Sequence, residues 1–364
     1  MIGEIYYVTG IPFEAARKVS ILPNGHRASR LHGHSFLARI RTKLPDDWAI
    51  FPGAEVEQLQ DCASQSIQPL DYSLLNDHLT VPTDENVARW IRERIGLSSV
   101  DVVGVQSTNN QGVDIDKNND AHIWRRFRFE AAHQLPNVEE GHQCGRMHGH
   151  GFEVILHVSQ NVDNQDIGID FDHIEALWAP IYAQLHLACL NDLHGLENPT
   201  SEVISAWIWS RLKPKLAELS WITIYETTTA GCHFDGENYR IWKEFRFESA
   251  IKLLGANKND PRQKLHGHSY LSRLHLTAPL DEVMGWTVDY GDVKALFKPA
   301  YKKLDHHYLN ELAGVENGDL ASILAWMQGQ LLDVLPSLDR IDLYQTPGCG
   351  AVLSWGGESP ALPV

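Results

Sequence analysis

The chain has 364 residues, of which 43% are hydrophobic and 21% charged, and its formal net charge is −16. Its apolar runs fall short of the ~18 residues that a membrane span needs, and the acidic balance argues against a nucleic-acid interface, which relies on Lys and Arg. The first five residues contain neither a basic start nor an apolar run, so we expect no secretion signal, no membrane or nucleic-acid partner and a cytoplasmic protein.

Three markers recur in the same order three times along the chain. Phe-Glu-Ala/Ser-Ala stands at 13–16, 129–132 and 247–250, and a Leu-x-x-x-x-Leu-Asn segment follows at 70–76, 185–191 and 304–310. Between them, His-Gly-His stands at 32–34, 148–150 and 266–268, so its copies lie 148 − 32 = 116 and 266 − 148 = 118 residues apart. The chain is therefore predicted to consist of repeat 1 (1–120), repeat 2 (121–240) and repeat 3 (241–364).

Within repeat 2 the order of predicted elements is two strands, two helices and two strands. Alternating apolar residues predict strands over 125–134 and 147–158, and apolar residues at helical spacing predict a helix over 173–187. A second helix begins at Pro199-Thr200 and should end or kink at Pro214, and strands over 221–227 and 239–242 complete the unit. The junctions at 123–129 and 241–247 are strand-like and contain no linker, which favours one continuous sheet.

Repeat 2 alone holds three histidines that can converge on a metal ion. His148 and His150 lie two apart on a predicted strand, so their side chains share a face, and His133 ends the preceding strand. Three imidazoles with an open fourth position are typical of catalytic zinc, whereas an isolated His-x-His is most often only a pair of core or surface histidines. The position of His133 is Arg17 in repeat 1 and Ile251 in repeat 3, so we expect no tight zinc binding in those repeats.

The stretch Phe129-Glu130-Ala131-Ala132-His133, followed by Cys144-Gly145-Arg146-Met147-His148-Gly149-His150, resembles the 6-pyruvoyltetrahydropterin synthase and 6-carboxytetrahydropterin synthase family. The likeness covers repeat 2 well and repeats 1 and 3 in degraded form. It implies an α+β tunnelling fold, in which three ββααββ units form one twelve-stranded antiparallel barrel with helices outside. A cysteine four residues before the first histidine of the His-Gly-His looks closer to the 6-carboxy enzymes.

The resemblance also implies the remaining site residues. Cys144 would be the catalytic thiol, and an Asp-His pair that the family takes from a neighbouring unit survives only as Asp305-His306 in repeat 3. One complete active site per chain, between repeats 2 and 3, is the simplest expectation. The other four cysteines are expected to be small apolar side chains without a chemical role.

Two acids of repeat 2 complete the implied site. Thr200 and Glu202 match the family segment that anchors the pterin, and Glu226 matches an acid of the catalytic relay. Gln106 and Gln345 are expected to take the place of Glu226 in the other repeats. A first-turn acid such as Glu202 also favours a helix by itself, because it complements the helix dipole.

The implied reaction is the zinc-dependent conversion of 7,8-dihydroneopterin triphosphate to 6-carboxy-5,6,7,8-tetrahydropterin, on the route to queuosine. One alternative is the 6-pyruvoyl synthase reaction, which eliminates triphosphate and retains the side-chain carbons. The other is a non-catalytic pterin- or purine-binding scaffold. By analogy with stacked trimers of single-unit relatives, the chain is expected to form a homodimer.

Overall fold

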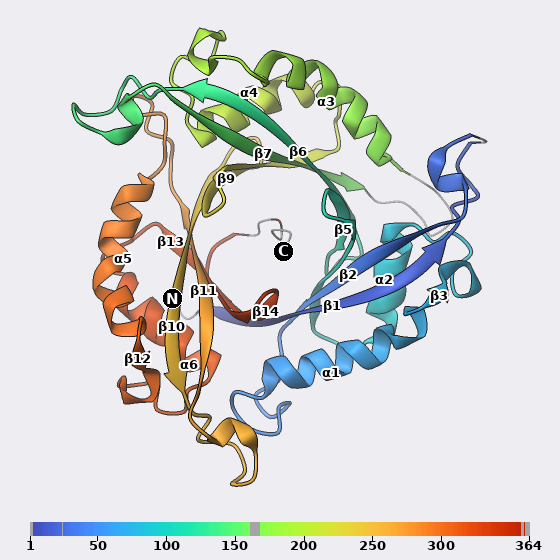
Figure 1. Ribbon diagram of the computed structural model, residues 1–364, viewed down its shortest axis with the longest axis vertical. Helices are drawn as coiled ribbons and strands as arrows, with labels where there is room; N and C mark the ends of the chain where they lie inside the picture. The colour runs from blue at the N-terminus through green and yellow to red at the C-terminus, as the bar shows by residue number, and fades with distance from the viewer. Residues whose placement is uncertain (1–2, 24, 161–167, 358–359, 361–364) are drawn as a thin grey trace.

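The computed structural model describes residues 3–23, 25–160, 168–357 and 360. Its centre is a closed antiparallel barrel, with the helices wrapped around the outside (Figure 1). Each repeat contributes four strands to the barrel, and the pairing of β10 with β11 closes the ring. The predicted fold class, a twelve-stranded barrel of three ββααββ units, is confirmed.

The strands of the three repeats follow one pattern, in which a long hairpin precedes the helices and a short hairpin follows them. The long hairpins are β1 (Glu4–Arg17) with β2 (His32–Thr42), β6 (Ala121–His133) with β7 (His148–Gln160), and β10 (Tyr239–Ile251) with β11 (His266–Thr277). The short hairpins are β4 (Val100–Thr108) with β5 (Gln111–Ile115), β8 (Leu219–Thr227) with β9 (Ala230–Phe234), and β13 (Leu338–Thr346) with β14 (Cys349–Ser354). Two-residue strands, β3 (Ser73–Leu74) and β12 (His307–Tyr308), add to the edges of β1 and β10.

The helices lie outside the barrel in pairs, one pair for each repeat (Figure 1). Side-chain caps define where most of them begin, because an oxygen at the N-cap satisfies a backbone N–H of the first turn. Thr83 and Thr200 cap the second helix of repeats 1 and 2, and Asp319 caps that of repeat 3. The helices are α1 (Glu55–Ile67), α2 (Asp84–Arg94), α3 (Phe171–Leu185), α4 (Ser201–Leu212), α5 (Tyr290–Leu304) and α6 (Leu320–Leu331). In the described part of the chain, no helix is both long and apolar enough to cross a membrane.

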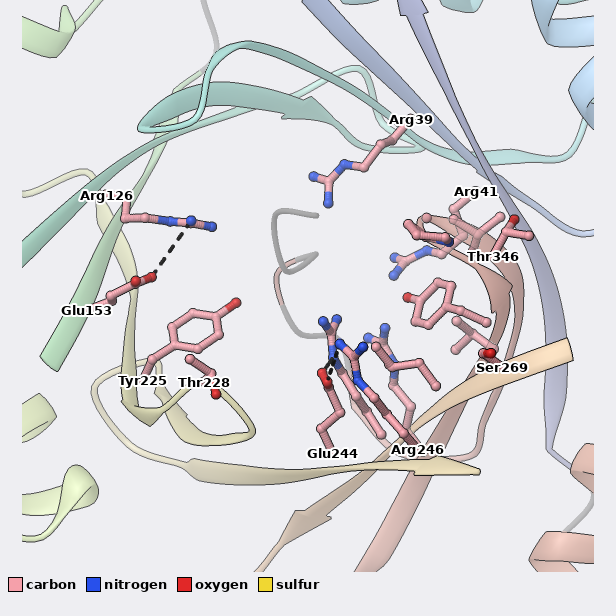
Figure 2. Close-up of a pocket in the computed structure, with 18 of the residues that line it drawn as sticks. Arg39, Arg41, Arg126, Glu153, Tyr225, Thr228, Glu244, Arg246, Ser269 and Thr346 are labelled. Atoms are coloured by element: carbon pink, nitrogen blue, oxygen red, sulfur yellow. Dashed lines mark hydrogen bonds and ion pairs between the residues drawn. The ribbon is translucent and has the colours of Figure 1, made fainter. Parts of the chain in front are cut away.

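The barrel wall separates two environments. Side chains alternate across each strand, so one set packs under the helices and the next set faces the lumen. Phe129 and Phe152 stack with ring centroids 5.0 Å apart in the outer core, with less than 2% of each residue exposed. Glu153 and Arg126 point into the lumen instead (Figure 2). Chemistry on the helix side is therefore separate from chemistry inside the barrel.

One predicted element was wrong. The segment 239–242 is the start of β10 in repeat 3, and the fourth strand of repeat 2 is β9. The strand β9 has the sequence Ala-Gly-Cys-His-Phe, and every residue in it is buried. Because neither face of the strand is exposed, its sequence lacks the alternation of polar and apolar residues that predicts a half-buried strand. The antiparallel pairing of β9 with β10 joins the two repeats directly.

Candidate functional site

Strand pairing brings the three predicted metal ligands together. His133, the last residue of β6, pairs with His148, the first of β7, and His150 follows on the same face. One ligand nitrogen from each ring lies within 4.8 Å of the others, and the Nε2 atoms of His133 and His150 are 3.1 Å apart. Among the residues that the structure describes, no other group of three metal-binding side chains is this close.

Backbone carbonyls orient two of these rings. The carbonyl oxygen of Pro199 lies 3.2 Å from Nδ1 of His133, and that of Arg146 lies 2.8 Å from Nδ1 of His148. A carbonyl can only accept, so Nδ1 carries the proton and Nε2 is left free to bind a metal. Burial, followed by the neighbouring imidazoles, lowers the pKa of His133 to about 4, which keeps the ring neutral. Neutral, oriented imidazoles of this kind fit a zinc ion.

In repeat 1, a guanidinium takes the place of the first metal ligand. Arg17 donates to Asp84 at 2.6 Å, and one of its nitrogens lies 3.2 Å from Nε2 of His34. Burial and the charge of Arg17 lower the pKa of His34 to about 4. The equivalent position in repeat 3, Ile251, is a buried hydrocarbon. Neither arrangement offers three ligands to a metal.

Cys144 lies in a short turn that leads from the end of β6 back to β7. Its carbonyl accepts a hydrogen bond from the backbone N–H of Leu135, and its own N–H donates to Nδ1 of His142 at 3.2 Å. Burial raises the pKa of the half-buried thiol, and the negative charges of Glu226 and Asp289 raise it further. The thiol therefore stays protonated at neutral pH unless a cation or a base is brought to it.

A loop of repeat 3, residues 281–290, covers this site. Thr200 and Asn198 donate to backbone carbonyls of the loop at 2.5 and 2.6 Å, respectively. Asp289 lies 3.6 Å from Nε2 of His142, and it caps α5 by accepting from Gly291 and Asp292. The histidine site of repeat 2 thus lies at the junction with repeat 3.

The two predicted acids occupy different environments. Both carboxylate oxygens of Glu202 have protein partners: one accepts from the backbone and hydroxyl of Thr287, and the other accepts from Ser201. Burial and then the charge of Glu202 raise the pKa of Glu226 to about 7. Glu226 can therefore gain or lose a proton near neutral pH, while Glu202 is held by the loop of repeat 3.

The single chain does not bring Asp305 and His306 to Cys144. Asp305 accepts from the backbone of Glu248 and lies 3.0 Å from Nδ1 of His306, whose side chain is 77% exposed. The pair follows the last residue of α5, whereas Tyr290, the first residue of that helix, contacts Ser201 in the site. Fifteen helical residues at about 1.5 Å each separate the two ends by roughly 22 Å.

Sequence reasoning missed the contribution of the 281–290 loop. Asp289, Thr287 and Tyr290 all touch the site. Asp289 and Tyr290 hold the places of Asp170 and Phe171 in repeat 2, where Asp170 likewise caps the first helix. An acid at this position predicts a helix cap and not a site.

The expected counterpart of Glu226 in repeat 1 was also wrong. Glu153 pairs with Tyr225 in repeat 2 and Leu37 pairs with Gln106 in repeat 1, so Gln106 corresponds to Tyr225, and the position of Glu226 is taken by Ser107.

Comparison with known proteins agrees with the triplication. The model of the family described as 6-pyruvoyl tetrahydropterin synthase matches residues 8–116, 122–237 and 240–354. A 6-carboxy-5,6,7,8-tetrahydropterin synthase of Synechocystis is 37% identical over 119 residues, 31% of this chain and 91% of the relative. A putative 6-carboxy-5,6,7,8-tetrahydropterin synthase of Archaeoglobus fulgidus is 35% identical over 88 residues, 24% of this chain and 71% of the relative. The solved 6-pyruvoyl tetrahydropterin synthase of Caenorhabditis elegans is 17% identical and covers 31% of this chain and 92% of its own, with a TM-score of 0.28.

Proposed function

The chain belongs to the 6-pyruvoyl tetrahydropterin synthase family, and we propose that it is a zinc-dependent lyase that converts 7,8-dihydroneopterin triphosphate to 6-carboxy-5,6,7,8-tetrahydropterin. The observation that carries the proposal is the convergence of His133, His148 and His150 in repeat 2, the repeat that also carries Cys144 and the neighbouring acid Glu226. The two curated relatives named above favour the 6-carboxy product. Such a product would feed the synthesis of 7-deazapurines such as queuosine in the cytoplasm.

The chain's own residues supply binding and proton transfer. The three imidazoles would hold a zinc ion, whose charge acidifies the substrate carbon next to a bound hydroxyl. Cys144 would take that proton as a thiolate, and its raised pKa means that it needs a nearby base. Glu226, with a pKa of about 7, is suited to pass a proton to or from the pterin.

The pterin ring would bind beneath the 281–290 loop. Its amino group and ring N–H are donors, which a carboxylate accepts well when both are buried. Glu202 accepts from Thr287 in the structure, so a ring anchored by Glu202 must displace that contact. Glu226 keeps more accepting capacity and lies near enough to Cys144 to raise its pKa. We therefore propose that both acids meet the pterin, with Thr200 positioning Glu202 through the cap of α4.

A second copy of the chain would deliver the missing base. Asp305 and His306 form a preoriented pair whose imidazole is largely exposed, and one chain holds this pair far from Cys144. An exposed apolar residue directly precedes the His-Gly-His of every repeat, as expected of an interface. These residues are Leu31, Met147 and Leu265. Two more, Tyr72 and Leu187, hold the position of His306 in repeats 1 and 2. We propose a homodimer in which His306 of the partner subunit reaches Cys144.

Co-expression of two inactive variants tests this arrangement. Cys144→Ala and His306→Ala homodimers should each lose turnover, because every site lacks either the thiol or its base. A mixed dimer has one intact site out of two, and random pairing makes half of all dimers mixed, so the mixture should recover about a quarter of wild-type activity. No recovery from a mixture in which affinity tags confirm mixed dimers would contradict the shared site.

Product analysis distinguishes the alternatives. Zinc-loaded wild-type protein and 7,8-dihydroneopterin triphosphate should release acetaldehyde together with the 6-carboxy product. A 6-pyruvoyl product without acetaldehyde would instead identify the triphosphate-eliminating reaction. Pterin binding without turnover at full zinc occupancy would identify a binding scaffold.

A further inference from the structure

The lumen of the barrel is a second cavity, of about 660 Å³, separate from the histidine site. A volume of this size is typical of small-molecule sites, which span about 300–1,000 Å³. Guanidinium groups from all three repeats point into it, as Figure 2 shows for those it labels. The lining arginines are Arg39, Arg41, Arg126, Arg128, Arg246, Arg273 and Arg340.

Arginines outnumber acids in the lining of the lumen, although the chain as a whole carries a charge of −16. Seven arginines line it, against four acids, Asp114, Glu153, Glu244 and Glu248. Three of the arginines, Arg41, Arg128 and Arg340, pair with acids that lie outside the lining, Asp101, Glu130 and Asp342. The surface that an occupant would meet therefore presents more guanidinium than carboxylate.

The internal ion pairs leave donors unused. A single carboxylate, that of Glu244, forms ion pairs with both Arg246, at 3.4 Å, and Arg273, at 3.0 Å. Arg126 lies 3.7 Å from Glu153, beyond hydrogen-bond distance, and its buried Nε has no partner among the described residues. A guanidinium has five N–H donors, so these side chains retain capacity for an incoming anion.

Aromatic side chains hold two of the arginines in place. Arg126 lies over the ring of Tyr225 at 6.0 Å, and Arg273 lies over that of Tyr344 at 5.7 Å. Stacking of this kind orients a guanidinium without consuming its N–H donors. The result is a set of cations whose donor edges are fixed, which is what recognition of phosphate oxygens requires.

Repetition accounts for only part of the basic surface. At the offsets of the repeat, Arg39 corresponds to Arg273 and Arg128 to Arg246, so these four arginines are repeated. Arg126 corresponds instead to Gly10 and Glu244, and Arg340 corresponds to Val102 and Trp221, so these two arginines make the lining asymmetric.

We propose that the lumen binds a multiply charged phosphate anion of the linear polyphosphate class, with Arg126 and Arg273 as direct contacts. Bidentate hydrogen bonds from guanidinium groups of repeats 2 and 3 match the oxygens of such an anion. This site does not depend on the proposed reaction, since the metal-binding histidines point to the helix side of the wall and the arginines point to the lumen.

Calorimetric titration of the full-length, zinc-loaded protein with sodium tripolyphosphate at low salt tests the proposal. Wild-type protein should bind one tripolyphosphate per chain, and binding should weaken as salt is raised. Arg126→Gln should lower the affinity about tenfold, because a charge-assisted contact is lost, and adding Arg273→Gln should lower it further. Lys298→Gln removes the same charge from the exposed face of α5 and should change nothing.

Two further measurements keep this test apart from the active site. His148→Ala destroys the metal triad and should leave tripolyphosphate binding intact, while Arg126→Gln should leave turnover intact. The ion pair between Arg126 and Glu153 is long, at 3.7 Å, so we expect Arg126→Gln to fold. Its affinity for tripolyphosphate therefore tests the lumen site even if the buried Arg273→Gln fails to fold. Absence of saturable binding, equal binding by Arg126→Gln, or loss of binding in His148→Ala would each overturn the lumen site.

Discussion

Replacement of Glu226 by glutamine should stabilise the protein at alkaline pH and have no effect at acid pH. The substitution keeps the shape of the side chain and removes its proton equilibrium. Burial and the nearby charge of Glu202 raise the folded-state pKa from 4.5 to about 7, so the folded chain holds this proton more tightly than the unfolded chain. Below pH 4.5 the carboxyl is protonated in both states and contributes no difference.

The difference between the folded and unfolded pKa of Glu226 determines how much the substitution changes stability at each pH. Between pH 4.5 and 7 the unfolded chain releases the proton first, so wild-type stability falls as pH rises, and above pH 7 the full penalty applies. At about 1.4 kcal/mol for each tenfold change in proton affinity, the penalty approaches about 3 kcal/mol. Glu226→Gln should escape this penalty, and its melting temperature should exceed that of wild type by roughly 4 °C at pH 8.

Thermal unfolding from pH 4 to 8.5, at equal zinc saturation, measures this difference. The gap between variant and wild type should open between pH 5 and 7 and then stay constant. Glu218→Gln, at an exposed position, serves as the matched control and should follow wild type throughout. Parallel curves for wild type and Glu226→Gln over the whole range would show that Glu226 does not take up a proton on folding.

Two further changes probe the division between the repeats. Zinc analysis of purified protein should give close to one ion per chain, which His133→Ala should remove and His32→Ala should not; two or three ions per chain would contradict the single triad. Arg17→Met should destabilise the chain by about 3–5 kcal/mol, because the buried carboxylate of Asp84 then loses its ion-pair partner. Arg17→Met with Asp84→Leu should recover most of that loss in denaturant melts, and a double variant as unstable as the single one would refute the pairing argument.

The parts of the site that lie on one hairpin could be predicted from the sequence. His133, His148 and His150 are brought together by the pleat and by pairing of adjacent strands, both of which a local motif encodes. The barrel followed from the repeat and the strand-like junctions, because three units joined strand to strand can close on themselves.

Contacts between repeats could not be predicted in this way. Thr287 lies 85 residues from Glu202 along the chain, and no pattern in the 281–290 loop marks it as a partner. The prediction that Gln106 corresponds to Glu226 was wrong for a different reason. The paired residues of the long hairpin and the following strand lie 106 − 37 = 69 residues apart in repeat 1 and 225 − 153 = 72 residues apart in repeat 2, and only the strand pairing shows which positions correspond.

The turns that carry Tyr72, Leu187 and His306 keep one backbone conformation in all three repeats. All three residues have left-handed backbones, with φ of 52°, 61° and 59°, and each donates its N–H to a strand carbonyl at 2.6 Å. None is glycine, so each turn is held against a conformational cost by the fold itself. The turn therefore persists where the histidine has been lost.

A homodimer of such chains has a single two-fold axis, and that axis can place only one repeat of the partner over each metal triad. If repeat 3 of one chain faces repeat 2 of the other, His306 serves both sites of the dimer by symmetry. Histidines at the turns of Tyr72 and Leu187 would then face no metal, and a complete histidine triad in repeat 1 or 3 would face no base. Because no base would face repeats 1 and 3, their metal ligand can be replaced by Arg17 and Ile251 without loss of an active site. Two complete sites per dimer remain.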